Sequence, residues 1–205
     1  MTIELKSAAK FYKNLIHQNE AWEYLQKSIP TSVLNEFANK YRNQTPRVSQ
    51  SGIELIKKFE GFESKAYPDP LSGNLPITIG YGSTKNLDGQ PFKLGETITQ
   101  QQAEELLINQ ILKDFIPSLQ KIPYWDSMNS DMQGALLSFG YNLGADFYNS
   151  SGFNTITKTL KEKRWKDVPS ALNLYVNPGT NVTVGLMRRR KAEGELWISG
   201  LNRLA

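Results

Sequence analysis

The chain has 205 residues and a net charge of +4 at pH 7, with 39% hydrophobic and 21% charged residues. This balance is typical of a globular protein, and the length suits one medium domain with an appendage. The chain has no cysteine and one histidine, which excludes disulfides and argues against clustered-imidazole metal sites and Ser-His-Asp catalysis. We therefore expect no metal or other cofactor. The positive charge favours an anionic partner, which is a nucleic acid, a membrane surface or a cell-wall polymer.

The first segment, residues 1 to 45, carries apolar side chains at helical spacing and predicts a short helical extension of three helices. Its start lacks the unbroken apolar stretch of a secretory signal, and nowhere do about 18 consecutive apolar residues occur. We expect synthesis in the bacterial cytoplasm without a signal peptide, and no integral membrane segment. Residues 46 to 52 are polar and turn-rich and predict a linker to one domain over 53 to 205.

The predicted domain begins with a helix followed by a strand. Residues 53 to 59 have an amphipathic helical pattern, and Gly61 is a stop signal that leaves Glu60 at the end of the helix. The segment ITIGYG at 77 to 82 alternates β-branched residues with glycines. This pattern predicts a short strand and a tight hairpin.

The rest of the domain has mainly helical patterns. Thr99 and Gln102 form a predicted capping box at the start of a long helix, and Pro117 is expected to end it. Further helical patterns follow, and NPG at 177 to 179 predicts a turn before a last helix over 183 to 198. A small β element followed by a helical body predicts an α+β fold that is mainly α.

Two carboxylates, Glu60 and Asp69, are candidates for acid and base chemistry. Phe59 and Phe62 would give Glu60 an apolar setting, which raises the pKa of a carboxyl group and suits a general acid. The loop around Asp69 is polar and would keep its carboxylate ionised. Two acids in opposed environments are what glycosidic hydrolysis requires. Acidic residues are also common on ordinary surface turns, and that alternative stays open on these residues alone.

Two other motifs are interpreted as structural features and not as binding sites. Gly80 and Gly82 do not form a dinucleotide loop, because Lys85 stands where the third glycine would be and no βαβ unit surrounds them. The run RRRK at 188 to 191 is interpreted as a solvated, salt-bridged helix face, because acidic residues such as Glu193 follow it. We therefore expect no nucleic-acid partner. The four tryptophans are expected to serve mostly in core packing.

The order of the motifs resembles that of phage-type lysozymes, glycoside hydrolase family 24. The motifs are, in chain order, FEGF, an aspartate nine residues after its glutamate, TIGYG, ITQQQAEELL, ALLSFGYNLG, KRW and GLMRRRKAEGELW. The resemblance runs from about Ser51 to the C-terminus. It implies a small β-sheet lobe and a larger helical lobe, joined by a long helix that corresponds to residues 99 to 116, with the substrate cleft between the lobes.

The resemblance also implies roles for five residues. Glu60 corresponds to the general acid that protonates the leaving glycosidic oxygen, and Asp69 to the carboxylate that acts on the opposite face of the sugar. Thr78 corresponds to the hydroxyl that helps to hold the attacking water. Tyr141 and Asn142 fall where the helical lobe meets the substrate, although both could equally be packing residues.

Two departures from the family pattern lie close to these residues. Asp69 and Thr78 are nine positions apart, about three more than is usual in the family, which predicts a longer loop over the cleft. Ser83 stands where the family commonly has a histidine after its GYG segment.

The resemblance implies a muramidase that cleaves the β-1,4 bond between N-acetylmuramic acid and N-acetylglucosamine in bacterial peptidoglycan with inversion, and so lyses cells. It would act as a monomer on the wall, after release by a separate route. A lytic transglycosylase and a wall-binding protein without turnover are the alternatives. Asp69 and Thr78 argue against the first, and the intact acid pair argues against the second.

Overall fold

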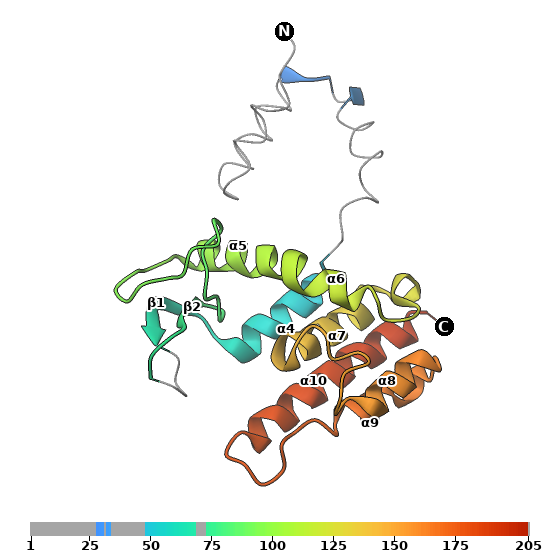
Figure 1. Cartoon of the computed structure of the whole chain (residues 1–205). Helices are drawn as coiled ribbons and strands as arrows, with labels where there is room; N and C mark the ends of the chain where they lie inside the picture. Colours follow the sequence, from blue (N-terminus) through green and yellow to red (C-terminus); the bar gives the residue numbers. More distant parts are fainter. Residues whose placement is uncertain (1–27, 31, 34–47, 69–72, 205) are drawn as a thin grey trace. The chain divides into compact units, whose positions relative to one another are not determined.

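A computed structural model describes residues 28 to 30, 32 to 33, 48 to 68 and 73 to 204 (Figure 1). The chain divides into two compact units, Met1–Arg47 and Val48–Ala205, and the boundary falls inside the predicted linker. The helices predicted within residues 1 to 45 fall almost entirely outside the described residues. In the described part, no helix is long and apolar enough to cross a membrane.

The second unit has a two-stranded sheet early in the chain and is otherwise mainly helical, which confirms the predicted α+β, mainly α, class. Its elements are α4 (Gln50–Glu60), β1 (Glu63–Pro68), β2 (Ile77–Gly80), α5 (Gln100–Gln110), the π-helix η1 (Ile111–Phe115), α6 (Ile116–Leu119), the 3-10 helix η2 (Trp125–Ser127), α7 (Ser130–Leu143), α8 (Asn154–Lys161), the 3-10 helix η3 (Trp165–Asp167), α9 (Val168–Leu172) and α10 (Thr183–Asn202).

Helix α4 begins earlier than its apolar pattern predicts. The Ser49 hydroxyl accepts a hydrogen bond from the Gly52 N–H and caps the helix, so the last residues of the predicted linker are helical. At the other end, Gly61 has a φ of 75° and its N–H bonds to the Lys57 carbonyl. The predicted stop signal is confirmed, and Glu60 is the last residue of α4.

Strands β1 and β2 pair antiparallel, with Tyr67 opposite Thr78 and Pro68 opposite Ile77. The predicted strand is confirmed but ends at Gly80, where a positive φ turns the chain into a tight hairpin. Strand alternation places Thr78 on the face opposite to Ile77. Buried Ile77 packs in a small apolar cluster with residues of the following loop and α5, whereas Thr78 is half-buried.

The long helix that follows confirms the predicted capping box, because Thr99 and Gln102 each accept a hydrogen bond from the other's backbone N–H. The prediction that Pro117 ends this helix is wrong. After α5 the helix widens into η1 and continues as α6 to Leu119. Pro117 stands in the first turn of α6, where a missing N–H breaks no hydrogen bond of that helix.

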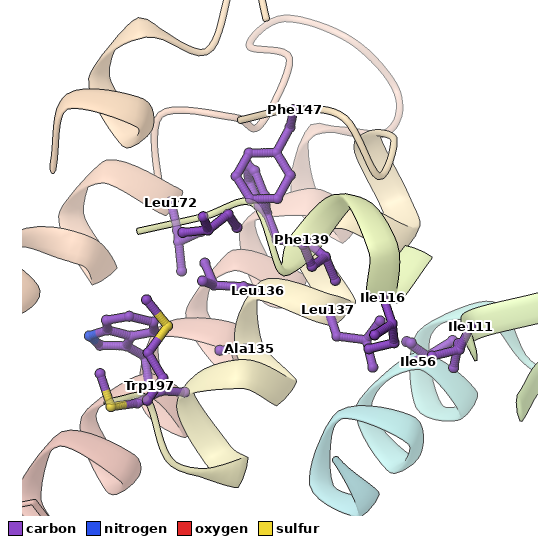
Figure 2. Close-up of a cluster of buried hydrophobic side chains, with 14 of the residues drawn as sticks. Ile56, Ile111, Ile116, Ala135, Leu136, Leu137, Phe139, Phe147, Leu172 and Trp197 are labelled. Atoms are coloured by element: carbon purple, nitrogen blue, oxygen red, sulfur yellow. The ribbon is translucent and has the colours of Figure 1, made fainter. Parts of the chain in front are cut away.

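The core is built around α7, which contacts both α4 and α10 (Figure 1). Figure 2 shows side chains of α4, η1, α6, α7, α9 and α10 meeting there, with Leu136, Phe139 and Trp197 fully buried. Trp125 is also buried, as expected for a core residue, and Trp165 is half-buried. The predicted last helix is confirmed as α10, which extends beyond residue 198 to Asn202.

Helices α4 and α7 cross closely at two glycines. A Cβ atom added at Gly52 would lie 2.7 Å from the Cα of Gly134, and backbone atoms cannot give way as a flexible side chain can. We expect Gly52→Ala to lower the free energy of unfolding by about 1 to 3 kcal/mol. Urea denaturation followed by circular dichroism measures this change.

The matched control is Gly185→Ala in α10, because nothing lies within 4 Å of a Cβ atom at that position. Alanine favours a helix over glycine, so this control should be neutral or stabilise the protein by up to about 1 kcal/mol. Equal effects of the two substitutions would contradict the close crossing.

Candidate active site

Glu60 projects from the end of α4 and is held by an arginine of α10. Nη1 of Arg189 donates a hydrogen bond of 2.7 Å to Oε1 of Glu60. The Arg189 side chain is 5% exposed and that of Glu60 is 27% exposed. The cation is therefore buried, and the carboxylate that it binds remains accessible to solvent.

The surroundings of Glu60 differ from the purely apolar setting expected from its two phenylalanine neighbours. The ring of Phe59 lies 5.6 Å from the Arg189 guanidinium carbon. Phe62 is 36% exposed, and its ring centroid lies 5.7 Å from that of Tyr81. The carboxylate therefore has a cationic partner, which packs on one of the two rings.

Arg189 belongs to a buried polar network between α10 and α7. Oε1 of Glu193 accepts hydrogen bonds from the Ser138 hydroxyl at 2.7 Å and from Nε of Arg189 at 3.3 Å. It also accepts one from Nη2 of Arg190 at 3.2 Å, and that nitrogen donates to Oδ1 of Asn142 at 2.7 Å. A continuous chain of polar contacts thus runs from Glu60 through α10 to Asn142.

The interpretation of the basic run as a solvated face is wrong for its two central residues. Arg189 and Arg190 are 4% and 0% exposed, whereas Arg188 and Lys191 are exposed. The reason is the helical spacing: residues three and four positions before Glu193 lie on its face of α10, and that face is buried.

Burial and charge oppose each other in this network. Burial raises the pKa of Glu193 to about 6, and attraction to Arg190, the Ser138 hydrogen bond and Arg189 act against this shift. Burial likewise lowers the pKa of Arg190 to about 10, against the attraction of Glu193. Both shifts show that desolvation is costly here, so each charge depends on its partners.

Among the described residues, no group of three His, Cys, Asp or Glu side chains could hold a metal ion.

Tyr141 joins the β-hairpin to the long helix beside this network. Its single hydroxyl proton is shared between the Tyr81 carbonyl at 2.9 Å and Oε1 of Gln110 at 3.3 Å. Burial raises the pKa of Tyr141, the Glu60 carboxylate raises it further, and Arg189 lowers it. The hydroxyl of Tyr141 is therefore a neutral donor within electrostatic reach of Glu60.

The other two predicted residues belong to the β part. Thr78 is half-buried on β2 opposite Tyr67, and within the described residues no hydrogen bond joins it to Glu60. Asp69 lies outside the described residues, directly after Pro68 at the end of β1. The structure thus links Glu60 to Asn142 through the network of α10 and places Tyr141 within electrostatic reach of Glu60, and the roles of all five residues stay predictions.

Four residues of the network were missed as site residues: Ser138, Arg189, Arg190 and Glu193. The spacing R-R-x-x-E within one predicted helix puts both arginines on the face of the glutamate, and this was the available signal. Nothing local indicated that this face is buried or that it reaches Glu60. That contact joins residues 129 positions apart.

Comparisons with known proteins agree with this fold. The phage lysozyme family model matches residues 57–193, a stretch that includes all five predicted site residues and the network of α10. The endolysin of Salmonella phage P22 is 33% identical over 155 residues, which cover 75% of this chain and 99% of the relative. The endolysin of Bacillus phage B103 is 31% identical over 153 residues, which cover 75% of this chain and 54% of the relative.

Solved structures of phage enzymes have a similar fold. A mutant of P22 lysozyme matches with a TM-score of 0.60 and 30% identity, over 75% of this chain and 99% of that chain. An endolysin from Escherichia coli O157:H7 phage FAHEc1 matches with a TM-score of 0.61 and 29% identity. The match covers 75% of this chain and 94% of that chain. These likenesses confirm the expected lysozyme-like fold.

Proposed function

The chain belongs to the phage lysozyme family and is a glycoside hydrolase, and on this basis we propose that it is a muramidase of bacterial peptidoglycan. The bond cleaved is the β-1,4 bond between N-acetylmuramic acid and N-acetylglucosamine. The net charge of +4 supports binding to an anionic wall polymer. The proposed enzyme works as a monomer and reaches the wall by a separate release route.

In the proposed reaction Glu60 gives its proton to the glycosidic oxygen as that oxygen leaves the anomeric carbon. Asp69 takes a proton from a water molecule that attacks the same carbon from the opposite face, and Thr78 helps to hold this water. The products are two shorter sugar chains, one with a new reducing end of inverted configuration. An inverting reaction needs a gap of about 6.5 to 9.5 Å between the carboxyl groups, which leaves room for the water.

The geometric observation that supports the role of Glu60 in this proposal is the hydrogen bond that its carboxylate accepts from buried Arg189. It fixes the acid at the end of α4 and orients it, as a positioned general acid requires. Arg189 also contacts Glu193 and donates to the Ser138 carbonyl, so the guanidinium keeps partners when Glu60 is protonated. Glu60 can therefore exchange a proton without leaving a buried cation alone.

Mass spectrometry of the fragments released from purified peptidoglycan tests the reaction type. Attack by water gives ordinary reducing ends, and we expect these throughout the digest. If the sugar's own hydroxyl attacked instead, the fragments would carry 1,6-anhydro ends and the protein would be a lytic transglycosylase. Nuclear magnetic resonance of the fresh product tests inversion at the anomeric carbon.

A further inference from the structure

A pocket next to the candidate active site has no role in the reaction as proposed. It lies between the loop that follows the β-hairpin and one side of α5 and η1, has a cavity volume of about 90 Å³, and is partly open to solvent. The residues of its lining that matter here are Ser83, Lys85, Asn86, Gln110, Lys113 and Asp114.

The pocket shares a wall with the active site. Gln110 lines it and accepts a hydrogen bond of 3.3 Å from the hydroxyl of Tyr141, which also bonds to the Tyr81 carbonyl. Gln110 thus separates the pocket from Tyr141, so the pocket lies on the far side of a residue that borders the candidate active site.

The pocket offers hydrogen-bond donors. Ser83 is 3% exposed, and its hydroxyl has no hydrogen-bond partner among the described residues. The side-chain oxygen of Asn86 already accepts from the backbone N–H groups of Asp88 and Gln90, and its NH₂ group makes no hydrogen bond within the described residues. Gln110 likewise uses its side-chain oxygen for Tyr141 and keeps its NH₂ group.

The charges of the pocket favour an anion. Lys85 and Lys113 line it and make no ion pair within the described part of the chain, and Asp114 is the one acid in the lining. Lys113 and Asp114 lie on the π-helix η1, a rare widening that interrupts the long helix at this wall. Such π-helical turns occur frequently at functional sites.

We propose that this pocket binds a carboxylate of the peptide stems of peptidoglycan, so that the enzyme prefers strands with acidic stems. The proposal rests on the muramidase function proposed above. The sugars of the strand are neutral apart from the groups linked through the lactyl ether of N-acetylmuramic acid, where the stems begin. Two ammonium groups with hydroxyl and amide donors beside them suit a carboxylate.

The test compares two substrates prepared from the same soluble peptidoglycan strands. One keeps its stem carboxylates, and the other has them converted to carboxamides, which removes the charge and nearly keeps the shape. We expect the wild-type enzyme to show kcat/KM roughly five- to tenfold higher on the acidic strands. In Lys85→Gln/Lys113→Gln this ratio should fall to about 1.

The matched control is Lys121→Gln/Lys158→Gln, which removes the same charge from two exposed lysines outside the pocket. It should keep the wild-type ratio. A wild-type ratio near 1, or equal loss in both double variants, would overturn the pocket proposal. The proposal would also be overturned if the enzyme preferred strands that carry wall phosphate polymers and kept this preference after the stem carboxylates had been amidated. Cleavage of both substrates by the wild type leaves the muramidase function standing in each case.

Discussion

Glu60→Gln should lower the rate of wall lysis by about 10²- to 10⁴-fold, the usual contribution of a general acid. Glutamine keeps the shape of the side chain and can still accept the hydrogen bond from Arg189, but it has no proton to give to the leaving oxygen. The fall should appear in kcat more than in KM, because the lost interaction belongs to the transition state. Loss of turbidity of a wall suspension measures the rate, and soluble muropeptide substrates separate the two constants.

Glu54→Gln is the matched control, because Glu54 lies on the same helix and pairs with Lys57 at the surface. It should keep nearly full activity, since exposed ion pairs contribute little. Thermal unfolding of both variants must lie close to the wild type for the comparison to hold. If Glu60→Gln lysed walls at the wild-type rate, another group would have to supply the proton, and the proposed mechanism would be abandoned.

The parts of the fold that could be predicted are those with a local cause. The stop at Gly61 needs only a residue that accepts a positive φ, and the Thr99 capping box needs two side chains one turn apart. Pro117 misled the prediction, because its effect depends on the helix around it. The widening into η1 lets a new helical turn begin, and in a first turn proline is tolerated.

The parts of the candidate site that could be predicted are those with a local signal in the sequence. Glu60 was identified from its place at a helix end and from a resemblance in motif order. Its partner Arg189 was not, because their contact depends on how α4 and α10 pack against α7. The surroundings of an acid are set by such long-range contacts, so neighbours in sequence such as Phe62 describe them poorly.

Arg190→Met should lower the free energy of unfolding by about 3 to 5 kcal/mol. The Arg190 side chain is 0% exposed, and its guanidinium carbon lies 4.6 Å from the Phe139 ring. Its removal leaves the buried Glu193 carboxylate with Arg189, which also pairs with Glu60. The midpoint of thermal unfolding should fall by roughly 6 to 20 °C, as scanning calorimetry would show.

Lys191→Met, one position along α10, is the control, because its side chain is 77% exposed and lies 3.9 Å from Glu195. It should change the stability by less than about 0.5 kcal/mol. The double variant Arg190→Met/Glu193→Met distinguishes a lost charge balance from lost packing. It removes the two charges together and leaves Arg189 paired with Glu60, so it should be more stable than the sum of its single variants predicts. Additive losses would mean that the network contributes through packing alone.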